Sequence, residues 1–139
     1  MANMLARVPL FEGCTNMDLS RIASLSEERI YKEGQVIVKA GDPGKAFYVI
    51  TNGKVKVVAG ESPEGRKEAE LGRGEFFGEL SLLDGDARTR TVVAETPLET
   101  IRIDRSAFRR LLRKEPNLAI RLLEGMARRT RNILDTPSL

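Results

Sequence analysis

Two charged side chains near the middle of the chain have types and a spacing that could do chemistry. Glu79 follows Gly78, where a strand-like run ends and a short stretch of helix-forming residues begins. Amide N–H groups at the start of a helix have no intrahelical partners, so an anion is favoured there. A carboxylate in this first turn can accept a hydrogen bond from a sugar hydroxyl, although plain helix capping would explain it equally well.

Arg88 is the second of these side chains and comes nine residues after Glu79. It follows a turn over residues 84–87 and precedes the next strand-like run, so the chain is expected to bring it back beside Gly78. Its planar guanidinium matches the oxygens of a phosphate group. An arginine at such a boundary is more often a solvated surface charge, but its pairing with the Gly-Glu turn favours binding. Residues 76–92 therefore predict a cradle for a ribose-phosphate.

The composition excludes several other kinds of chemistry. The chain has no histidine and a single cysteine, Cys14, so it lacks the commonest general base and the commonest zinc and iron ligand. A cupin-type metal enzyme with glycine-rich short strands would need histidines. A haem or iron–sulfur sensor would need histidine or a cluster of cysteines. We therefore predict that the chain is not an enzyme and holds no metal.

Size and hydropathy indicate one domain outside the membrane. The 139 residues suffice for a single core, with 41% hydrophobic and 31% charged residues and a net charge of +3. No stretch approaches the roughly 20 consecutive apolar residues that span a bilayer. The N-terminus lacks the apolar core of a signal peptide, and one cysteine cannot form an intrachain disulfide. A cytoplasmic location and no membrane insertion are expected.

The hydrophobic pattern changes twice along the chain. Helical spacing over Thr15–Arg29 starts at a capping box formed by Thr15 and Asp18. Helical spacing returns in residues 106–114 and again from Pro116. Between them lie short strand-like runs separated by glycine turns: residues 35–38, 46–50, 55–59, 69–71, 91–94 and 98–103.

This order predicts an α+β fold with an antiparallel, jelly-roll-like β-roll, an N-terminal helix and two C-terminal helices. The whole chain, residues 1–139, is expected to form a single domain. Its parts are an N-terminal helical segment (1–32), a β-roll (33–103) and C-terminal helices (104–139).

The stretch Gly78-Glu79-Leu80-Ser81-Leu82, with the later Arg88-Thr89, resembles the phosphate-binding cassette of cyclic nucleotide-binding domains. The glycines at positions 34, 41 and 53 and the closing pair of helices extend the resemblance over nearly the whole chain. The likeness is to the sensor domain of catabolite activator proteins. It implies an eight-stranded roll whose C-terminal helices form a lid over the ligand.

The resemblance also implies a role for each matching residue. Glu79 would bind the ribose 2′-OH, and Arg88 would pair with the cyclic phosphate. Gly78 and the backbone amides of Leu80 and Ser81 would line the sugar and phosphate. Thr89 would approach the phosphate or the purine edge, and the last helix would close over the base with Ile133 and Leu134. The predicted ligand-binding residues are Phe77, Gly78, Glu79, Leu80, Ser81, Arg88, Thr89, Ile133 and Leu134.

Arg90 departs from the family pattern, which has a small residue at this position. By strand alternation Arg90 would share a face with Arg88 and add charge near the phosphate. Alternatively, an irregularity of the strand turns it to solvent, which avoids the cost of two unpaired like charges. Thr89 leaves the choice between cAMP and cGMP open. A cyclic dinucleotide, with Arg90 as an extra phosphate contact, stays an alternative.

The implied function is a regulatory one in signalling: a cyclic nucleotide, cAMP or cGMP, binds and moves the C-terminal helices. The alternative is a degenerate interaction module on the same fold. Neither a helix-turn-helix nor a kinase or channel segment follows in this sequence, so the output is expected to act on a separate protein partner or through a homodimer. The arginines of the last two helices are expected to be solvated faces opposite an apolar stripe, and no direct DNA binding is expected.

Overall fold

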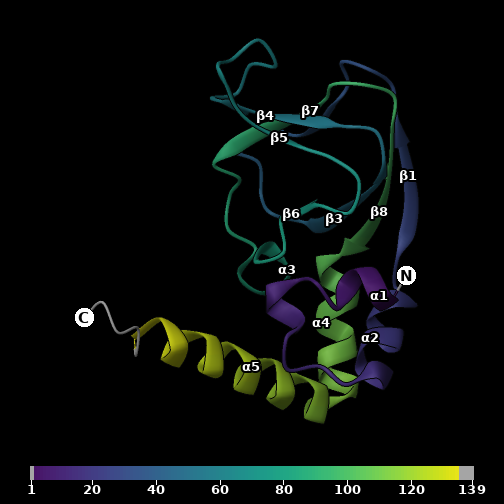
Figure 1. Ribbon diagram of the computed structural model, residues 1–139, viewed down its shortest axis with the longest axis vertical. Coiled ribbons are helices and arrows are strands. Elements are labelled where there is room, and N and C mark those ends of the chain that lie inside the picture. Colours follow the sequence, from purple (N-terminus) through teal and green to yellow (C-terminus); the bar gives the residue numbers. More distant parts are fainter. Residues whose placement is uncertain (1, 135–139) are drawn as a thin grey trace.

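The computed structural model describes residues 2–134 and arranges eight strands in two antiparallel sheets, with helices before and after them in the chain (Figure 1). The strands are β1 (Glu27–Tyr31), β2 (Val36–Val38), β3 (Ala46–Asn52), β4 (Val55–Ala59), β5 (Lys67–Leu71), β6 (Phe76–Phe77), β7 (Arg90–Ala94) and β8 (Leu98–Asp104). The helices are α1 (Ala2–Leu5), the 3₁₀ turn η1 (Pro9–Phe11), α2 (Asn16–Ala23), α3 (Ser81–Asp84), α4 (Arg105–Lys114) and α5 (Pro116–Leu134). The predicted α+β class with a β-roll core is confirmed.

The two sheets have the strand orders β1-β8-β3-β6 and β2-β7-β4-β5. Side chains along β3 alternate between two cores, as the pleat of a strand requires. Phe47 and Val49 pack toward the helices, whereas Ile50 packs between the sheets. In the register of β3 with β8, Tyr48 lies opposite Arg102. The side chains of β3 and β8 that face the inside of the roll are therefore polar at the end of the roll that faces the helices.

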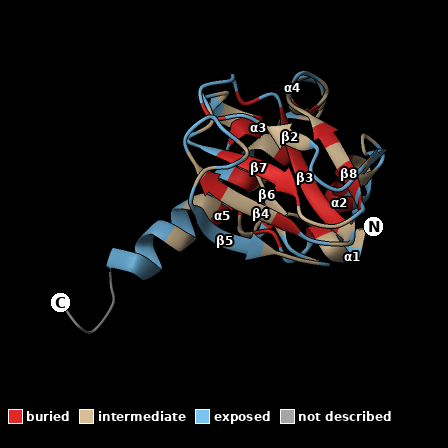
Figure 2. Cartoon of the chain, turned by 90° about the horizontal axis from the view of Figure 1, so that it is seen from above, coloured by how far each residue is buried: buried red, intermediate tan, exposed pale blue. Residues whose placement is uncertain are grey.

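The first half of α5 is fixed to the N-terminal segment. Arg121 donates two hydrogen bonds to the carboxylate of Asp18, at 2.6 and 2.7 Å, and the Asp18 side chain is fully buried. Gly13 and Gly125 meet backbone to backbone, since a Cβ on Gly125 would lie 2.6 Å from the Gly13 amide nitrogen. The second half of α5 runs away from the roll and is largely exposed (Figure 2).

The predicted helix over Thr15–Arg29 is wrong in its second half. Helix α2 ends at Ala23, and β1 begins at Glu27 as the edge strand of its sheet. Four of the five side chains of β1 are exposed, so the sequence carries no apolar alternation that would mark a strand. Leu25, the last apolar residue of the helical pattern, still packs on the main core after the helix has ended. The β-roll thus begins within the segment that was predicted to be helical.

The two predicted C-terminal helices are present as α4 and α5. The predicted lid segment, 104–139, also includes residues 135–139, which lie outside the described part of the chain. Among the helices of residues 2–134, none is long and apolar enough to cross a membrane.

Candidate functional site

The loop that carries Arg88 is held by its backbone against the loop between β2 and β3. The Arg88 amide donates to the Asp42 carbonyl at 2.8 Å, and the Gly41 amide donates to the Arg88 carbonyl at 2.8 Å. The Gly44 amide donates to the Asp86 carbonyl at 3.0 Å. These pairs fix the position of Arg88 although it lies outside any strand. The chain therefore returns beside the Gly78 turn, as predicted.

The Arg88 side chain reaches inward and lies directly against Gly78. Its Nη2 donates to the Ala46 carbonyl oxygen, and its Nε is buried with no hydrogen-bond partner among the described residues. Burial lowers the pKa of this guanidinium. Gly78 has a φ of +83°, and a Cβ there would lie 2.8 Å from Nη2 of Arg88 and 2.9 Å from the Ala46 oxygen. Glycine at this position thus leaves room for the guanidinium.

Glu79 is the second partly buried charge of the site. Its Oε2 has no hydrogen-bond partner within residues 2–134, and burial raises the pKa of the carboxyl, while the positive charge of Arg129 on α5 opposes this rise. Buried polar atoms are normally paired, because an unmade hydrogen bond is costly. The unpaired Glu79 oxygen and the unpaired Arg88 nitrogen therefore suit a ligand that carries both a hydroxyl and an anionic group.

The short helix α3 begins after Glu79. The Ser81 amide already donates to the Gly78 carbonyl at 3.1 Å, and the Ser81 side chain is buried. The amides of Glu79 and Leu80 form no backbone hydrogen bond within the described residues. The Leu80 side chain is exposed. Of the two amides predicted to line the sugar and phosphate, the structure thus leaves that of Leu80 available and uses that of Ser81 to close the turn.

Phe77 and Thr89, the next two predicted site residues, differ in their surroundings. Phe77 stacks on Tyr48, with ring centroids 5.0 Å apart and an angle of 15° between the rings. Thr89 is exposed, beside the start of β7. Phe77 therefore packs inside the roll beside Tyr48, whereas Thr89 is open to solvent.

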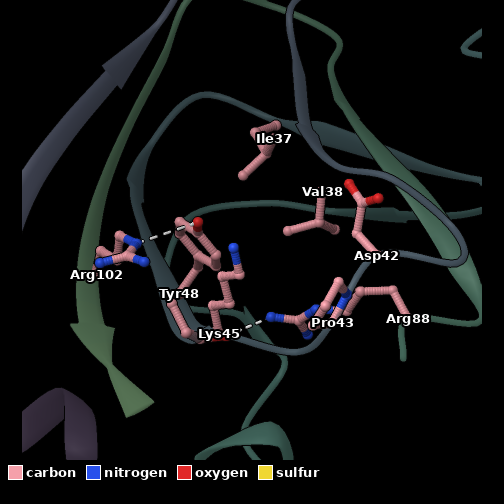
Figure 3. A pocket seen from close by; sticks show the side chains of 9 residues that line it. Ile37, Val38, Asp42, Pro43, Lys45, Tyr48, Arg88 and Arg102 are labelled. Carbon is pink, nitrogen blue, oxygen red and sulfur yellow. Dashed lines mark hydrogen bonds between the residues drawn. The ribbon is translucent and has the colours of Figure 1, made fainter. Parts of the chain in front are cut away.

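A cavity of about 320 Å³ opens beside Arg88, between the two sheets (Figure 3). Sequence reasoning did not include most of its walls: Ile37, Val38, Asp42, Pro43, Lys45, Ala46, Tyr48 and Arg102. Glu79 is not among these wall residues, although its neighbour Gly78 lies against Arg88, which is. The one signal in the sequence that indicated this cavity was Arg102, a charged residue at an inward position of a strand.

Comparison with known proteins gives the site its context. The family model described as the cyclic nucleotide-binding domain matches residues 28–115, more than half of the chain. This chain belongs to the cyclic nucleotide-binding domain family. The match includes residues 76–92, the predicted phosphate-binding cassette.

Relatives and a solved structure agree with this assignment. A cGMP-dependent protein kinase of Caenorhabditis briggsae is 37% identical over 115 residues, which cover 79% of this chain and 15% of the kinase. A cAMP-dependent protein kinase regulatory subunit of Colletotrichum orbiculare is 36% identical over 129 residues, which cover 93% of this chain and 30% of the subunit. The N-terminal domain of a transcriptional regulator from Streptomyces coelicolor A3(2) superposes with a TM-score of 0.81 at 34% identity, with 96% of each chain covered. Cyclic nucleotide-binding domains of this kind occur in regulatory proteins, and this chain spans less than a third of the length of either kinase-related protein.

Arg90, the departure from the family pattern, points away from the ligand region. Its Nε donates to the carboxylate of Glu68 on β5, its Nη1 donates to the Thr89 carbonyl at 3.2 Å, and its side chain is half exposed. The next residue, Thr91, is fully buried and bonds to the Ala40 amide and the Gly60 carbonyl. Arg90 is the first residue of β7 and pairs with Ala59, whereas Arg88 lies in the irregular stretch before the strand. Alternation therefore does not put the two arginines on one face, and Arg90 turns to solvent, the second of the two alternatives.

Ile133 and Leu134 are not brought to the cassette. They lie at the end of α5 with 69% and 64% of their surface exposed, where the helix runs away from the roll (Figure 1). Their predicted contact with the base therefore stays a prediction. No group of three or more histidine, cysteine, aspartate or glutamate side chains placed to hold a metal ion is found in residues 2–134.

Gly78→Ala is expected to destabilise the domain by about 1–3 kcal/mol, since it adds backbone strain at positive φ and crowds Arg88 and the Ala46 carbonyl. Gly60→Ala is the matched control, because Gly60 has a φ of +75° and no atom within 4 Å of its added Cβ. Urea unfolding of both variants separates strain from crowding. Equal losses of stability would show that Gly78 does not make room for Arg88.

Proposed function

We propose that this domain is a regulatory sensor, not an enzyme, that binds cAMP or cGMP between the Gly78–Glu79 turn and Arg88. The observation that carries the proposal is the pair of unpaired buried atoms within the cassette, Glu79 Oε2 and Arg88 Nε. One accepts and the other donates, which suits a ribose hydroxyl and a phosphate oxygen. The two relatives include one protein named for cAMP and one named for cGMP, so both nucleotides are candidates.

In the proposed complex Arg88 exchanges the Ala46 carbonyl for the cyclic phosphate. The amide of Leu80 adds a donor on the same side, and Glu79 accepts from the sugar. Because Arg88 is already partly desolvated, a phosphate gains a strong electrostatic partner there with little further loss of water by the protein. Phe77 and Tyr48 hold the wall of the site in place by their stacking.

We further propose that binding draws the second half of α5 toward the cassette. The Asp18–Arg121 ion pair and the Gly13–Gly125 contact hold the first half of α5, so the motion is confined to residues 126–134. The charge of Arg129 already acts on Glu79 across this gap. A ligand shifts this equilibrium only if it binds the closed arrangement more tightly. Closure would change the surface offered to a separate partner or to a second copy of the chain.

Titration of the purified protein with cAMP, cGMP and cyclic di-GMP in one buffer tests the nucleotide proposal. Binding of cAMP or cGMP, and at least about a tenfold loss of affinity in Glu79→Gln, supports it. Absence of binding by all three ligands would favour the degenerate interaction module instead.

The motion of α5 has its own test. The double variant Ile133→Asp, Leu134→Asp is expected to weaken nucleotide binding several-fold, because it disfavours contact of the helix end with the base. Leu123→Asp is the control, since Leu123 is 65% exposed on the same helix and outside the part proposed to move. If the double variant binds as tightly as the control, the helix end makes no contact with the nucleotide.

A further inference from the structure

A second hollow of the protein lies among its helices. It is a groove of about 680 Å³ between the residues that follow α2 and one side of α4. Figure 1 shows both helices below the roll. Three apolar side chains line the groove: Leu25, Ala107 and Leu111. No residue of the cassette is among its walls, so the groove is separate from the site proposed above for the nucleotide.

The positive charge of α4 is divided between two uses. The helix has five basic side chains and no acidic one. Arg105 and Arg109 are used inside the protein, where each donates to the Leu83 carbonyl at 3.2 Å. The remaining three line the groove with exposed side chains: Arg110, Arg113 and Lys114. None of these three side chains forms an ion pair or a hydrogen bond with another residue of the described part of the chain.

The helix dipole explains only part of this charge. Basic residues in the last turn of a helix stabilise it, and Arg113 and Lys114 lie there. Arg110 lies about one turn earlier. The dipole also leaves unexplained the apolar surface of Leu25 and Leu111, which pack on the main core but stay partly open in the groove. An apolar floor with a basic rim is complementary to a partner that is apolar in the middle and acidic around it.

The shape of the groove distinguishes among anionic partners. Arg110 and Lys114 lie only about 6 Å apart along the helix axis, so the cations form a compact cluster and not a stripe along several phosphates of a nucleic acid. A membrane surface takes up apolar side chains that project from a protein, whereas Leu25 and Leu111 are recessed against the core. An apolar side chain that projects from a peptide and is flanked by carboxylates fits both features.

We propose that the groove between α2 and α4 docks an acidic, amphipathic segment of a partner protein. An apolar side chain of the segment packs on Leu25 and Leu111, and its neighbouring aspartates or glutamates pair with the basic rim. The apolar contact supplies most of the affinity, and the charges orient the segment and exclude basic partners. This docking does not depend on a bound nucleotide.

The test uses the full chain and a panel of labelled synthetic peptides of about twelve residues, enough for three helical turns. Each peptide has leucine or phenylalanine among glutamates and aspartates, and fluorescence anisotropy at constant ionic strength measures binding. The double variant Arg110→Gln, Arg113→Gln is expected to weaken binding about tenfold, since it removes two ion pairs at the rim. Its matched control is Arg73→Gln, Arg128→Gln, which removes two exposed arginines outside the groove. Ala107→Gln narrows the groove without a change of charge and is also expected to weaken binding.

Loss of peptide binding in the Arg110, Arg113 double variant, with binding kept in the control, supports the proposal. Peptides with lysine in place of the acids, or serine in place of the apolar residues, are expected not to bind. If no acidic peptide binds the wild-type protein, or if the double variant binds as tightly as the control, the groove is not a docking site.

Two further probes distinguish a peptide from other anionic partners. If duplex DNA or phosphatidylserine vesicles bind more tightly than every peptide and lose binding in the double variant, phosphates satisfy the cations and the proposal is wrong. Arg110→Lys, Arg113→Lys keeps the charge and is expected to retain most of the affinity, and urea unfolding checks that both double variants are folded. Failure of the peptides to bind would leave the nucleotide proposal standing, and failure of cAMP and cGMP to bind would leave this one standing.

Discussion

Arg88→Glu is expected to abolish cyclic nucleotide binding, with a loss of at least about a hundredfold in affinity. The variant removes the proposed phosphate partner and puts a carboxylate against an anionic ligand. Calorimetric titration with cAMP and cGMP measures the effect. The size of the loss follows from burial, because the charge at this position is little screened by water.

A milder pair of variants separates binding from folding. Arg88→Gln keeps a donor beside the Ala46 carbonyl, and Arg90→Gln changes an arginine two residues away that is exposed and paired with Glu68. We expect Arg88→Gln to lose most of the affinity and Arg90→Gln to keep it. Equal affinities of the two variants would mean that Arg88 does not hold the phosphate. A loss of affinity in Arg90→Gln alone would mean that the base or a second phosphate reaches Arg90 at the start of β7.

Asp18→Ala is expected to lower the free energy of unfolding by about 3 kcal/mol, the lower end for a broken buried ion pair. Asp18 is fully buried and accepts two hydrogen bonds from Arg121, and it also accepts one from the Thr15 amide at 3.0 Å. The Arg121 side chain is 32% exposed, so after the substitution it can turn to water, which limits the loss. Urea unfolding gives the value, and Glu33→Ala, in an exposed turn, is the control.

The same pair predicts a pH dependence with a definite sign. The hydrogen bonds from Arg121 hold the pKa of Asp18 at about 2, below its ordinary value of 3.8. Because the folded state binds this proton more weakly than the unfolded state, the stabilisation is fully present above about pH 4 and is lost as the pH falls toward 2. The difference in stability between wild type and Asp18→Asn is therefore expected to be constant from pH 7 to 5 and to shrink below pH 4. A constant difference down to pH 2 would show that the Asp18 charge contributes nothing.

The Asp18–Arg121 pair also has a consequence for signalling. It ties α5 to α2, and so to the N-terminal segment that packs on the main core. If the second half of α5 moves on nucleotide binding, the first half is the fixed end against which it bends. Asp18→Ala should then weaken the coupling between nucleotide binding and the position of residues 126–134, in addition to lowering the stability of the domain.

Much of the fold and the centre of the site follow from local sequence. The Thr15–Asp18 capping box forms with both of its hydrogen bonds, because its partners are only three residues apart. The helices from Arg105 and Pro116 follow their apolar spacing, and each predicted strand-like run overlaps a strand, although Gln35 lies just before β2. Gly78, Glu79 and Arg88 could be predicted as candidate site residues because their chemistry is carried by a short loop, in which residue type and spacing are informative, and the structure places Arg88 against Gly78.

The tertiary structure decided what depends on partners far along the chain. The polar strand β1 forms because it pairs with β8, some seventy positions later in the chain. Its own sequence has no apolar alternation that would predict a strand. The direction of Arg90 depends on Glu68 of another strand and on where regular alternation begins. The cavity at Lys45, Tyr48 and Arg102 appears only when β3 and β8 are set in register. In each case the local sequence is compatible with more than one arrangement, and long-range pairing selects one of them.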